Sequence, residues 1–313
     1  MTTIAVVGHT NLETAVHVDH LKASVSDSFH AHALATTVSG VGVNVAVALR
    51  GLGNEVRFAT VIGRDTLGSA CLEEFATHGL DPSFVVRGVP ATAQSLSRFY
   101  RDGLRRNLVD LKDVQEATYP DDLVPALFDG VDIAVLTNIG YARPMLAMAR
   151  ERGIPIATDV HAVKGLWDPY NQDWLAAADV LFASQERIDL TPRDFVNAAL
   201  TQHRASVVVL GMGGSGSLLG VAGQDIVHVP PAHTRPVVNT VGAGDSLFSA
   251  YVDGWGRGME PLAALRRATL FASWKIGASG GAAGFLDRAG LDALVAQQEG
   301  SSAAHRRTGR PGP

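Results

Sequence analysis

The sequence has a single cysteine, Cys71, so a disulfide within the chain is excluded. Cysteine this scarce is typical of a reducing compartment, and we expect the protein in the cytoplasm. Long apolar runs are also missing, since none approaches the roughly 20 residues that a membrane helix needs. The first residues enter an apolar run with no charged segment ahead of it, unlike a secretory signal peptide. The sequence therefore predicts no contact with a membrane.

Charged residues are few as well, at 18% of the 313 residues, and apolar residues make up 46%. The net charge of −5 comes without a dense basic block, which argues against nucleic acid as a partner. The length is enough for a substantial core, and we expect one folded domain over residues 1–296. Residues 297–313 are rich in Ser, Arg, Gly and Pro, and we predict a disordered tail there.

Short apolar runs alternate with helical patterns along most of the chain. The apolar runs are rich in β-branched residues and predict buried strands at 4–7, 56–62, 133–136, 154–158, 180–182 and 207–210. The helical patterns lie between them, at 42–52, 67–78, 143–152, 174–178 and 192–203. This alternation predicts an α/β fold in which helices cover both faces of a parallel sheet.

Two segments, 12–38 and 85–110, interrupt the alternation with polar–apolar patterns that lack clear helices. Residues 95–106 are typical of a hairpin that turns at Asp102-Gly103. We expect both segments to leave the main sheet and pair as a small β-layer that covers a cleft. The alternative is a pair of edge strands that belong to the main sheet.

Residues 239–245, Asn-Thr-Val-Gly-Ala-Gly-Asp, carry the most informative pattern, because an apolar helical pattern begins directly after them. The first N–H groups of a helix lack internal partners, and small residues let an anion approach them closely. A carboxylate beside an anion site is unexpected unless Asp245 removes a proton from a hydroxyl that attacks a bound phosphorus. The segment predicts phosphoryl transfer to an alcohol; the alternative is an ordinary glycine-rich helix start.

A second glycine-rich turn, residues 39–42, runs into an apolar helical pattern in which Asn44 is the one strongly polar residue before Leu49. A buried amide without a partner costs on the order of 1–3 kcal/mol. Asn44 is therefore expected either to cap the helix or to hydrogen-bond a ligand hydroxyl.

Together these segments resemble the ribokinase-like, or phosphofructokinase-B type, family of carbohydrate and nucleoside kinases. Residues 239–245 look like its C-terminal signature, Asp/Asn-Thr-x-Gly-Ala-Gly-Asp. Residues 40–46, with Leu52-Gly53 following, look like its N-terminal signature, and residues 62–68 resemble its Gly-x-Asp-x-x-Gly segment. The order and separation of the three segments fit the family over about residues 4–295.

The resemblance implies a three-layer α/β sandwich with a mostly parallel central sheet and a small β-sheet lid. It also implies ATP as the donor, Mg²⁺, and a sugar or nucleoside whose hydroxymethyl group is phosphorylated; it leaves open a monovalent cation and a homodimer formed through the lid. Asp245 is similar to the family's general base, and the N–H groups of Gly242, Ala243 and Gly244 match its anion hole. The residues that match its acceptor side are Asn11, Glu13, Gly40, Gly42, Asn44 and Asn138. Those that match its nucleotide side are Ser184, Gly211, Gly213, Gly216 and Thr240.

The chain departs from the family pattern at the acceptor side. Glu13 stands where the family commonly has Asp, so its carboxylate reaches one carbon further, unless Asn11 makes the contact instead. Val41 stands where phosphofructokinase-like members often have Lys, which favours an unphosphorylated acceptor. His161 stands where the family often has Asn; contact with the acceptor, contact with water around magnesium and a structural bond are its alternatives.

The largest departure concerns the family's Asn-x-x-Glu segment, which organises magnesium and phosphates. Here Ser184 occupies the Asn position and Arg187 the Glu position, and Glu186 is the one acidic side chain near enough to substitute. One residue along a helix turns a side chain by about 100°, so we expect Mg²⁺ to be held mainly by phosphates and water.

Two further patterns are discounted. Residues 211–216 match Gly-x-Gly-x-x-Gly, but a strand pattern follows them where dinucleotide binding needs a helix. The histidine pairs His17/His20 and His30/His32 lack the spacing of a zinc site.

Two rival functions remain. A nucleoside kinase would need stacking side chains near the lid, for which Phe99 and Tyr100 are candidates. A non-catalytic sugar- or nucleotide-binding regulatory protein would explain the altered segment at 184–187, although the intact residues 242–245 argue against it.

Overall fold

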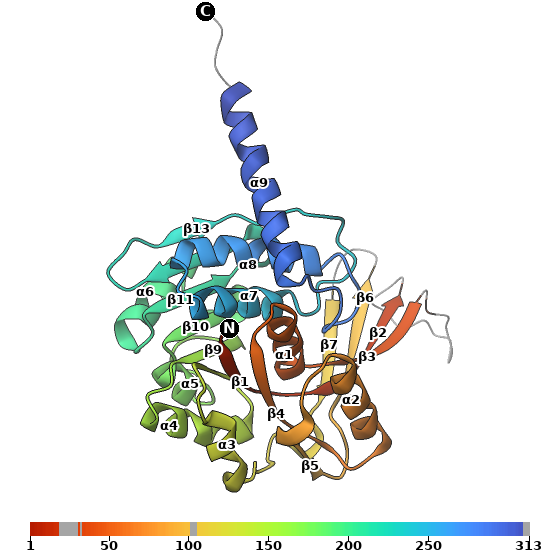
Figure 1. Ribbon diagram of the computed structural model, residues 1–313. Helices are drawn as coiled ribbons and strands as arrows, with labels where there is room; N and C mark the ends of the chain where they lie inside the picture. The colour runs from red at the N-terminus through yellow and green to blue at the C-terminus, as the bar shows by residue number, and fades with distance from the viewer. Residues whose placement is uncertain (19–30, 32, 101–104, 309–313) are drawn as a thin grey trace, which may run out of the picture.

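The computed structural model describes residues 1–18, 31, 33–100 and 105–308, and all structural statements concern these residues. They form a central sheet of nine strands in the order β13-β12-β11-β10-β9-β8-β1-β4-β5 (Figure 1). The bounds of these strands are β1 Thr3–Val7, β4 Glu55–Gly63, β5 Val85–Val89, β8 Ile133–Leu136, β9 Ile156–Ala162, β10 Val180–Ser184, β11 Val207–Gly211, β12 Ser217–Val221 and β13 Val227–Val229. Neighbouring strands are parallel from β11 to β5, and the β11–β12 and β12–β13 pairs are antiparallel.

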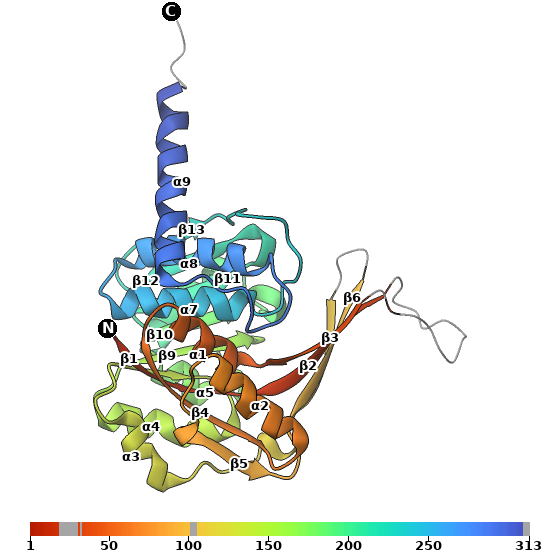
Figure 2. The ribbon, with the colours of Figure 1, turned by 45° about the vertical axis from the view of Figure 1, so that its right-hand side comes forward.

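Helices cover both faces of this sheet, as the alternation predicts (Figures 1 and 2). Their bounds are α1 Val41–Gly51, α2 Thr66–Thr77, α3 Val124–Phe128, α4 Arg143–Glu151, α5 Gln172–Ala177, α6 Pro192–Gln202, α7 Ala243–Gly256, α8 Pro261–Lys275 and α9 Arg288–Thr308. Alternate side chains of β1 enter different cores: Ile4 and Val6 pack with α1, α2, α7 and α8, and Ala5 and Val7 with α3 to α6. The sheet is thus the middle layer of three, and the predicted fold class is confirmed.

A second sheet, with strand order β3-β2-β6-β7, stands away from the main body (Figure 2). Its strands are β2 Asn11–Val18, β3 Ala33–Ser39, β6 Gln94–Tyr100 and β7 Arg105–Asp110. We call this sheet the lid. It begins four residues after β1 ends, so it rises from the edge of the central sheet where the carboxyl ends of the parallel strands meet. That edge is where α/β proteins bind their ligands.

Two predicted boundaries, those of the lid and of the C-terminal tail, differ from the structure. The lid expected over 85–110 begins at Gln94, because residues 85–89 pair in parallel with β4 as the edge strand of the central sheet. The predicted turn at Asp102-Gly103 lies outside the described residues, although β6 and β7 pair antiparallel on either side of it. Helix α9 continues through Thr308, beyond residue 297, where we predict disorder to begin.

Helix α9 projects from the body (Figure 2). Within the described part of the chain, no helix is both long enough and apolar enough to cross a membrane.

Candidate active site

The start of α7 is a tight turn at the carboxyl edge of the sheet. The side chain of Asn239 accepts a hydrogen bond from the N–H of Val241 at 2.8 Å, which closes the turn. Gly242 then adopts a φ of 73°, in the left-handed region, and precedes the helix as its N-cap. A Cβ on Gly242 would lie 2.8 Å from the carbonyl oxygen of Gly281, so a larger residue does not fit. The turn directs the unpaired N–H groups of the helix start outward.

The predicted anion hole is open on one side. Ala243 donates its N–H to the carbonyl of Thr240 at 3.2 Å, within the turn. Gly244 is exposed, and a Cβ there would meet no atom within 4 Å. An anion can therefore approach the backbone at Gly244 closely, where the helix dipole favours negative charge.

Asp245 lies in the first turn of α7 and is 9% exposed. Its Oδ2 accepts a hydrogen bond of 2.7 Å from Nδ2 of Asn44, a residue 201 positions away in the sequence. Burial raises the pKa of the Asp245 carboxyl, whereas His161, the amide of Asn44 and Lys275 act in the opposite direction and Asp159 adds to the rise. The two glycine-rich segments that sequence analysis singled out thus meet at one carboxylate beside an anion site.

The glycines before α1 bring Asn44 to this place. Gly40 has a φ of 111°, and a Cβ there would lie 2.6 Å from the carbonyl oxygen of His9. A Cβ on Gly42 would lie 2.3 Å from the backbone carbon of Gly8. Only glycine lets α1 start against the chain that leaves β1, and the 2.9 Å bond from Gly42 N–H to the His9 carbonyl fixes that contact. Gly40 and Gly42 therefore shape the acceptor side through the backbone.

The lid contributes two buried polar side chains. Nδ2 of Asn11 donates to the hydroxyl of Ser95 at 2.6 Å, and Oε1 of Glu13 accepts from the hydroxyl of Ser97 at 2.6 Å. Asn11 and Glu13 are each 5% exposed. They lie two residues apart on β2 and so share one face of the lid. Asn11 and Glu13, the two alternatives predicted for the acceptor contact, thus lie on the same face of the lid.

Five buried side-chain atoms of this region have no hydrogen-bond partner within the described structure. They are Nδ1 and Nε2 of His9, Oδ1 of Asn11, Oδ1 of Asn44 and Nε2 of His161. Burial, with a smaller contribution from the nearby His161, lowers the pKa of His9 to about 4, so the His9 ring is neutral at physiological pH. Buried polar atoms normally have partners, and a cluster without them indicates a site for a polar ligand.

Asn138 has a supporting place in the structure. Its amide donates to the carbonyl of Val160 at 3.3 Å and to Oδ1 of Asn171 at 3.0 Å. The first bond connects Asn138, two residues after the end of β8, to Val160 on β9. Val160 directly precedes His161.

The residues predicted for the nucleotide line the neighbouring strand ends. Ser184 and Gly211 are paired across β10 and β11. Gly213 and Gly216 have φ values of 57° and 87° in the turn after β11. A Cβ on Gly216 would lie 2.2 Å from the carbonyl oxygen of Val229, so this glycine is required by the packing of β13. Thr240 is exposed in the turn before α7.

In the described part of the chain, Glu186, the candidate metal ligand, does not belong to a group of metal-binding side chains. Glu186 is exposed, and its N–H donates to the hydroxyl of Ser184 at 3.4 Å. Among the residues that the structure describes, no group of three or more His, Cys, Asp or Glu is arranged to hold a metal ion. His20, His30 and His32, which belong to the discounted pairs, lie outside those residues.

Sequence analysis missed Lys275. This side chain is fully buried at the end of α8, and its Nζ donates to the carbonyl of Val241 in the turn before the anion hole. A lysine in the otherwise apolar run at the end of that helix was the available signal. His9 was also missed, because a single histidine after a strand has no recognisable pattern.

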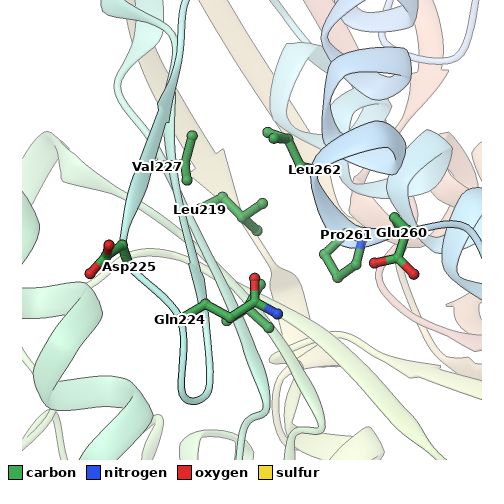
Figure 3. A pocket seen from close by; sticks show the side chains of 8 residues that line it. Leu219, Gln224, Asp225, Val227, Glu260, Pro261 and Leu262 are labelled. Atoms are coloured by element: carbon green, nitrogen blue, oxygen red, sulfur yellow. The ribbon is translucent and has the colours of Figure 1, made fainter.

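A small pocket lies between β12, β13 and the start of α8 (Figure 3). Leu219, Val227 and Leu262 line it, with Asp225 and Glu260 at its sides. It borders the first residues of α8, whereas Lys275 is at the far end of that helix, about 20 Å away at 1.5 Å per residue. The pocket is therefore separate from the candidate active site.

A family model described as pfkB family carbohydrate kinase matches residues 1–288. The chain belongs to this family. It is accordingly an ATP-dependent carbohydrate kinase, which confirms the predicted family and enzyme class. Acarbose 7(IV)-phosphotransferase of an Actinoplanes species is 25% identical over 294 residues, which cover 93% of this chain and 97% of that protein.

Two solved structures extend the comparison. A microbiome-derived acarbose kinase has a TM-score of 0.83 and 25% identity, and the match covers 94% of this chain and 99% of that one. A nucleoside kinase of Burkholderia thailandensis in complex with inosine has a TM-score of 0.80 at 17% identity, covering 96% and 99%. The second likeness, at this identity, shows the fold alone.

Proposed function

We propose that this kinase transfers the γ-phosphoryl group of ATP to a hydroxymethyl group of an unphosphorylated sugar. Asp245 takes the proton from the attacking hydroxyl, and the N–H groups of Gly242 and Gly244 stabilise the charge on the transferring group, joined by that of Ala243 once it releases the Thr240 carbonyl. The observation that supports the proposal is the 2.7 Å bond from Asn44 to Asp245, which joins the start of α1 to the start of α7. A carboxylate with a raised pKa is also a better proton acceptor than an ordinary aspartate.

The acceptor lies between Asn44 and the polar face of the lid that carries Asn11 and Glu13. A carboxylate and several amide oxygens suit a ligand with many hydroxyl groups. Val41, at the start of α1, offers no charge to a phosphate that the acceptor already carries. Two similar proteins are named for acarbose, so the candidate acceptors include glycosides as well as free sugars.

A nucleoside acceptor is the second candidate. Phe99 lies on the same lid strand as Ser97, and its ring stacks on His17 with centroids 5.0 Å apart. Since β-strand side chains two residues apart share a face, Phe99 is on the polar side of the lid, where a base could stack. Tyr100 is buried and belongs to the opposite face.

We place ATP at the strand ends and turns that carry Ser184, Gly211, Gly213, Gly216 and Thr240. Mg²⁺ would neutralise phosphate charge there, with Glu186 as the one predicted protein residue and phosphates and water as its other ligands. A monovalent cation is a further expectation, which a potassium titration of the activity tests. The buried lone cysteine agrees with the expected cytoplasmic location.

The first experiment measures acceptor-dependent ADP release from MgATP. The panel contains ribose, fructose, acarbose, other glycosides, adenosine and other nucleosides, with Asp245→Asn as the matched variant. Turnover that falls by about 10²- to 10⁴-fold in Asp245→Asn, with ATP binding retained in calorimetry, supports the proposal. Full activity of the variant contradicts the role of Asp245. Silence across the panel with intact ATP binding favours an untested acceptor or a non-catalytic role.

A further inference from the structure

Lys275 is a fully buried basic side chain that the reaction above does not use. It is the last residue of α8, and its Nζ donates to the carbonyl of Val241, which directly precedes the glycine that caps α7. Lysine is almost never fully buried unless its nitrogen has partners. A buried lysine bonded to the turn that forms the proposed anion hole indicates a role in shaping that turn.

The end of α8 holds the turn before α7 at two places. The backbone carbonyl of Ile276 accepts the N–H of Val238 at 2.8 Å and the N–H of Asn239 at 3.0 Å. Lys275 holds the same turn further along, at the carbonyl of Val241. Because these bonds come from outside α7, the direction of the N–H groups at the start of α7 depends on the end of α8.

Gly242 lies against the lysine and against the loop that follows α8. A Cβ on Gly242 would lie 3.3 Å from Nζ of Lys275 and 2.8 Å from the carbonyl oxygen of Gly281. Gly281 also lies against the start of α1, since a Cβ on it would lie 2.9 Å from Nδ2 of Asn44. The lysine and the loop after it thus contact both helix starts that form the site.

We propose that Lys275 is a positioning residue that acts as a built-in monovalent cation: its ammonium group holds the Val241 carbonyl, keeps the N–H groups of the anion hole directed at the transferring phosphoryl group, and makes turnover independent of dissolved K⁺. This rests on the proposed function of the anion hole. Burial opposes the charge of a lysine, but the C-terminal end of a helix and backbone carbonyl groups favour a cation. The resemblance leaves a dissolved monovalent cation open, and Lys275 supplies at this carbonyl the charge that such a cation would bring.

The test uses two substitutions of this one lysine. Lys275→Met removes the charge and keeps most of the volume, so kcat should fall at least about tenfold, whereas a lysine that only fills space would be replaced with little loss. The KM for the acceptor should stay nearly unchanged, because the polar side chains of the lid are untouched.

Lys275→Ala also opens space beside the Val241 carbonyl, and carbonyl oxygens are ligands that K⁺ accepts. Its kcat should fall as well, and K⁺ or methylammonium should raise it again by at least about fivefold. The ionic strength is held constant with tetramethylammonium chloride, whose cation is too large to enter. Lys275→Met, the matched control of filled volume, and the wild type should not respond to either cation.

A second readout does not depend on turnover. A cation that binds the folded Lys275→Ala protein should raise its unfolding temperature, and the same titration should leave the wild type and Lys275→Met unchanged. If the alanine variant does not fold, the kcat of Lys275→Met and the potassium response of the wild type still decide.

Activation of the wild type by K⁺, a wild-type kcat in Lys275→Met, or a folded Lys275→Ala that responds to neither cation overturns the proposal. If no acceptor is phosphorylated, the proposed function fails, while the unfolding temperatures still decide whether a cation replaces Lys275.

Discussion

At the scale of the residue, the buried carboxyl of Asp245 lowers the stability of the folded protein at neutral pH, where the proposed reaction needs it ionised. Burial raises its pKa above that of the unfolded chain, so its contribution to stability is fully present below the unfolded pKa and is lost as the pH rises through the folded pKa. Asp245→Asn should therefore unfold at a higher temperature than the wild type at pH 7, with Asn44 still able to donate to the new amide oxygen. The difference in unfolding temperature between the two proteins should narrow as the pH approaches 4, where the Asp245 side chain of the folded wild type is neutral, as the Asn side chain always is. Thermal unfolding followed by circular dichroism at several pH values checks this, and a less stable variant at pH 7 would contradict it.

Two glycines of the site should respond in opposite ways to the same added methyl group. Gly244→Ala places its Cβ in open space and improves helix propensity by up to about 1 kcal/mol, so stability should be kept or raised. The methyl group nevertheless obstructs the anion site, and kcat/KM for ATP should fall at least about tenfold. Gly42→Ala drives its Cβ into the Gly8 backbone and should cost about 1–3 kcal/mol of stability. Urea unfolding and steady-state kinetics on both variants separate the two effects; equal stability losses would show that Gly244 is also a packing residue.

At the scale of the element, one buried carboxylate ties together the helices that carry the site. Asp253 on α7 is fully buried and accepts hydrogen bonds from Asn54 at 3.0 Å, from Arg267 on α8 at 2.8 Å and from Arg288 on α9 at 2.9 Å. Asp253→Ala leaves the buried Arg267 charge without this partner and should cost about 3–5 kcal/mol.

The half-exposed Asp292 is the matched control for Asp253. It also bonds Arg267, at 3.2 Å, but its side chain is 53% exposed. Its replacement by Ala should cost less than about 1 kcal/mol, because water screens the pair. The free energy of unfolding in urea distinguishes the two variants, and similar losses would mean that Asp253 is not the centre of this network.

The elements also show where sequence reasoning succeeds. The glycine-rich starts of α1 and α7 carry their own local signal: the helix expected at 42–52 agrees with α1 to within one position, and the helical pattern expected directly after residue 245 lies within α7. The prediction for Val85–Val89 was wrong, because its polar–apolar pattern suits a lid strand. Only its pairing with β4 places this strand in the central sheet. The sequence marks Lys275 as unusual in an apolar run but does not predict its role, since that depends on the Val241 carbonyl, which another segment brings to it. What sequence could not predict was therefore set by contacts between distant segments.

At the scale of the whole molecule, the lid has a partly apolar face opposite the one that carries Asn11 and Glu13. Val16 on β2 shares this face with Leu34 on β3, and Leu96 and Leu108 continue it across β6 and β7, with the polar side chains of Thr14, Thr36, Arg98 and Arg106 among them. Leu34 and Leu108 are 69% and 53% exposed. Asn11 and Glu13 point from the other face, so covering the apolar side would leave the acceptor site open. The exposed leucines on this face make it a candidate association surface.

We therefore expect a homodimer in which the lids of two copies cover each other. A charge on this face opposes burial, so Leu108→Glu should shift the protein from dimer to monomer in sedimentation velocity. At the same protein concentrations, the sedimentation coefficient of the variant should depend on concentration, whereas that of the wild type should not. Leu190→Glu is the control, because Leu190 is 44% exposed before α6, outside the lid, and should leave the dimer intact. A monomeric wild type would refute the dimer, and equal dissociation of both variants would place the contact elsewhere. Because the lid also carries Glu13, loss of the dimer should raise the KM for the acceptor more than that for ATP.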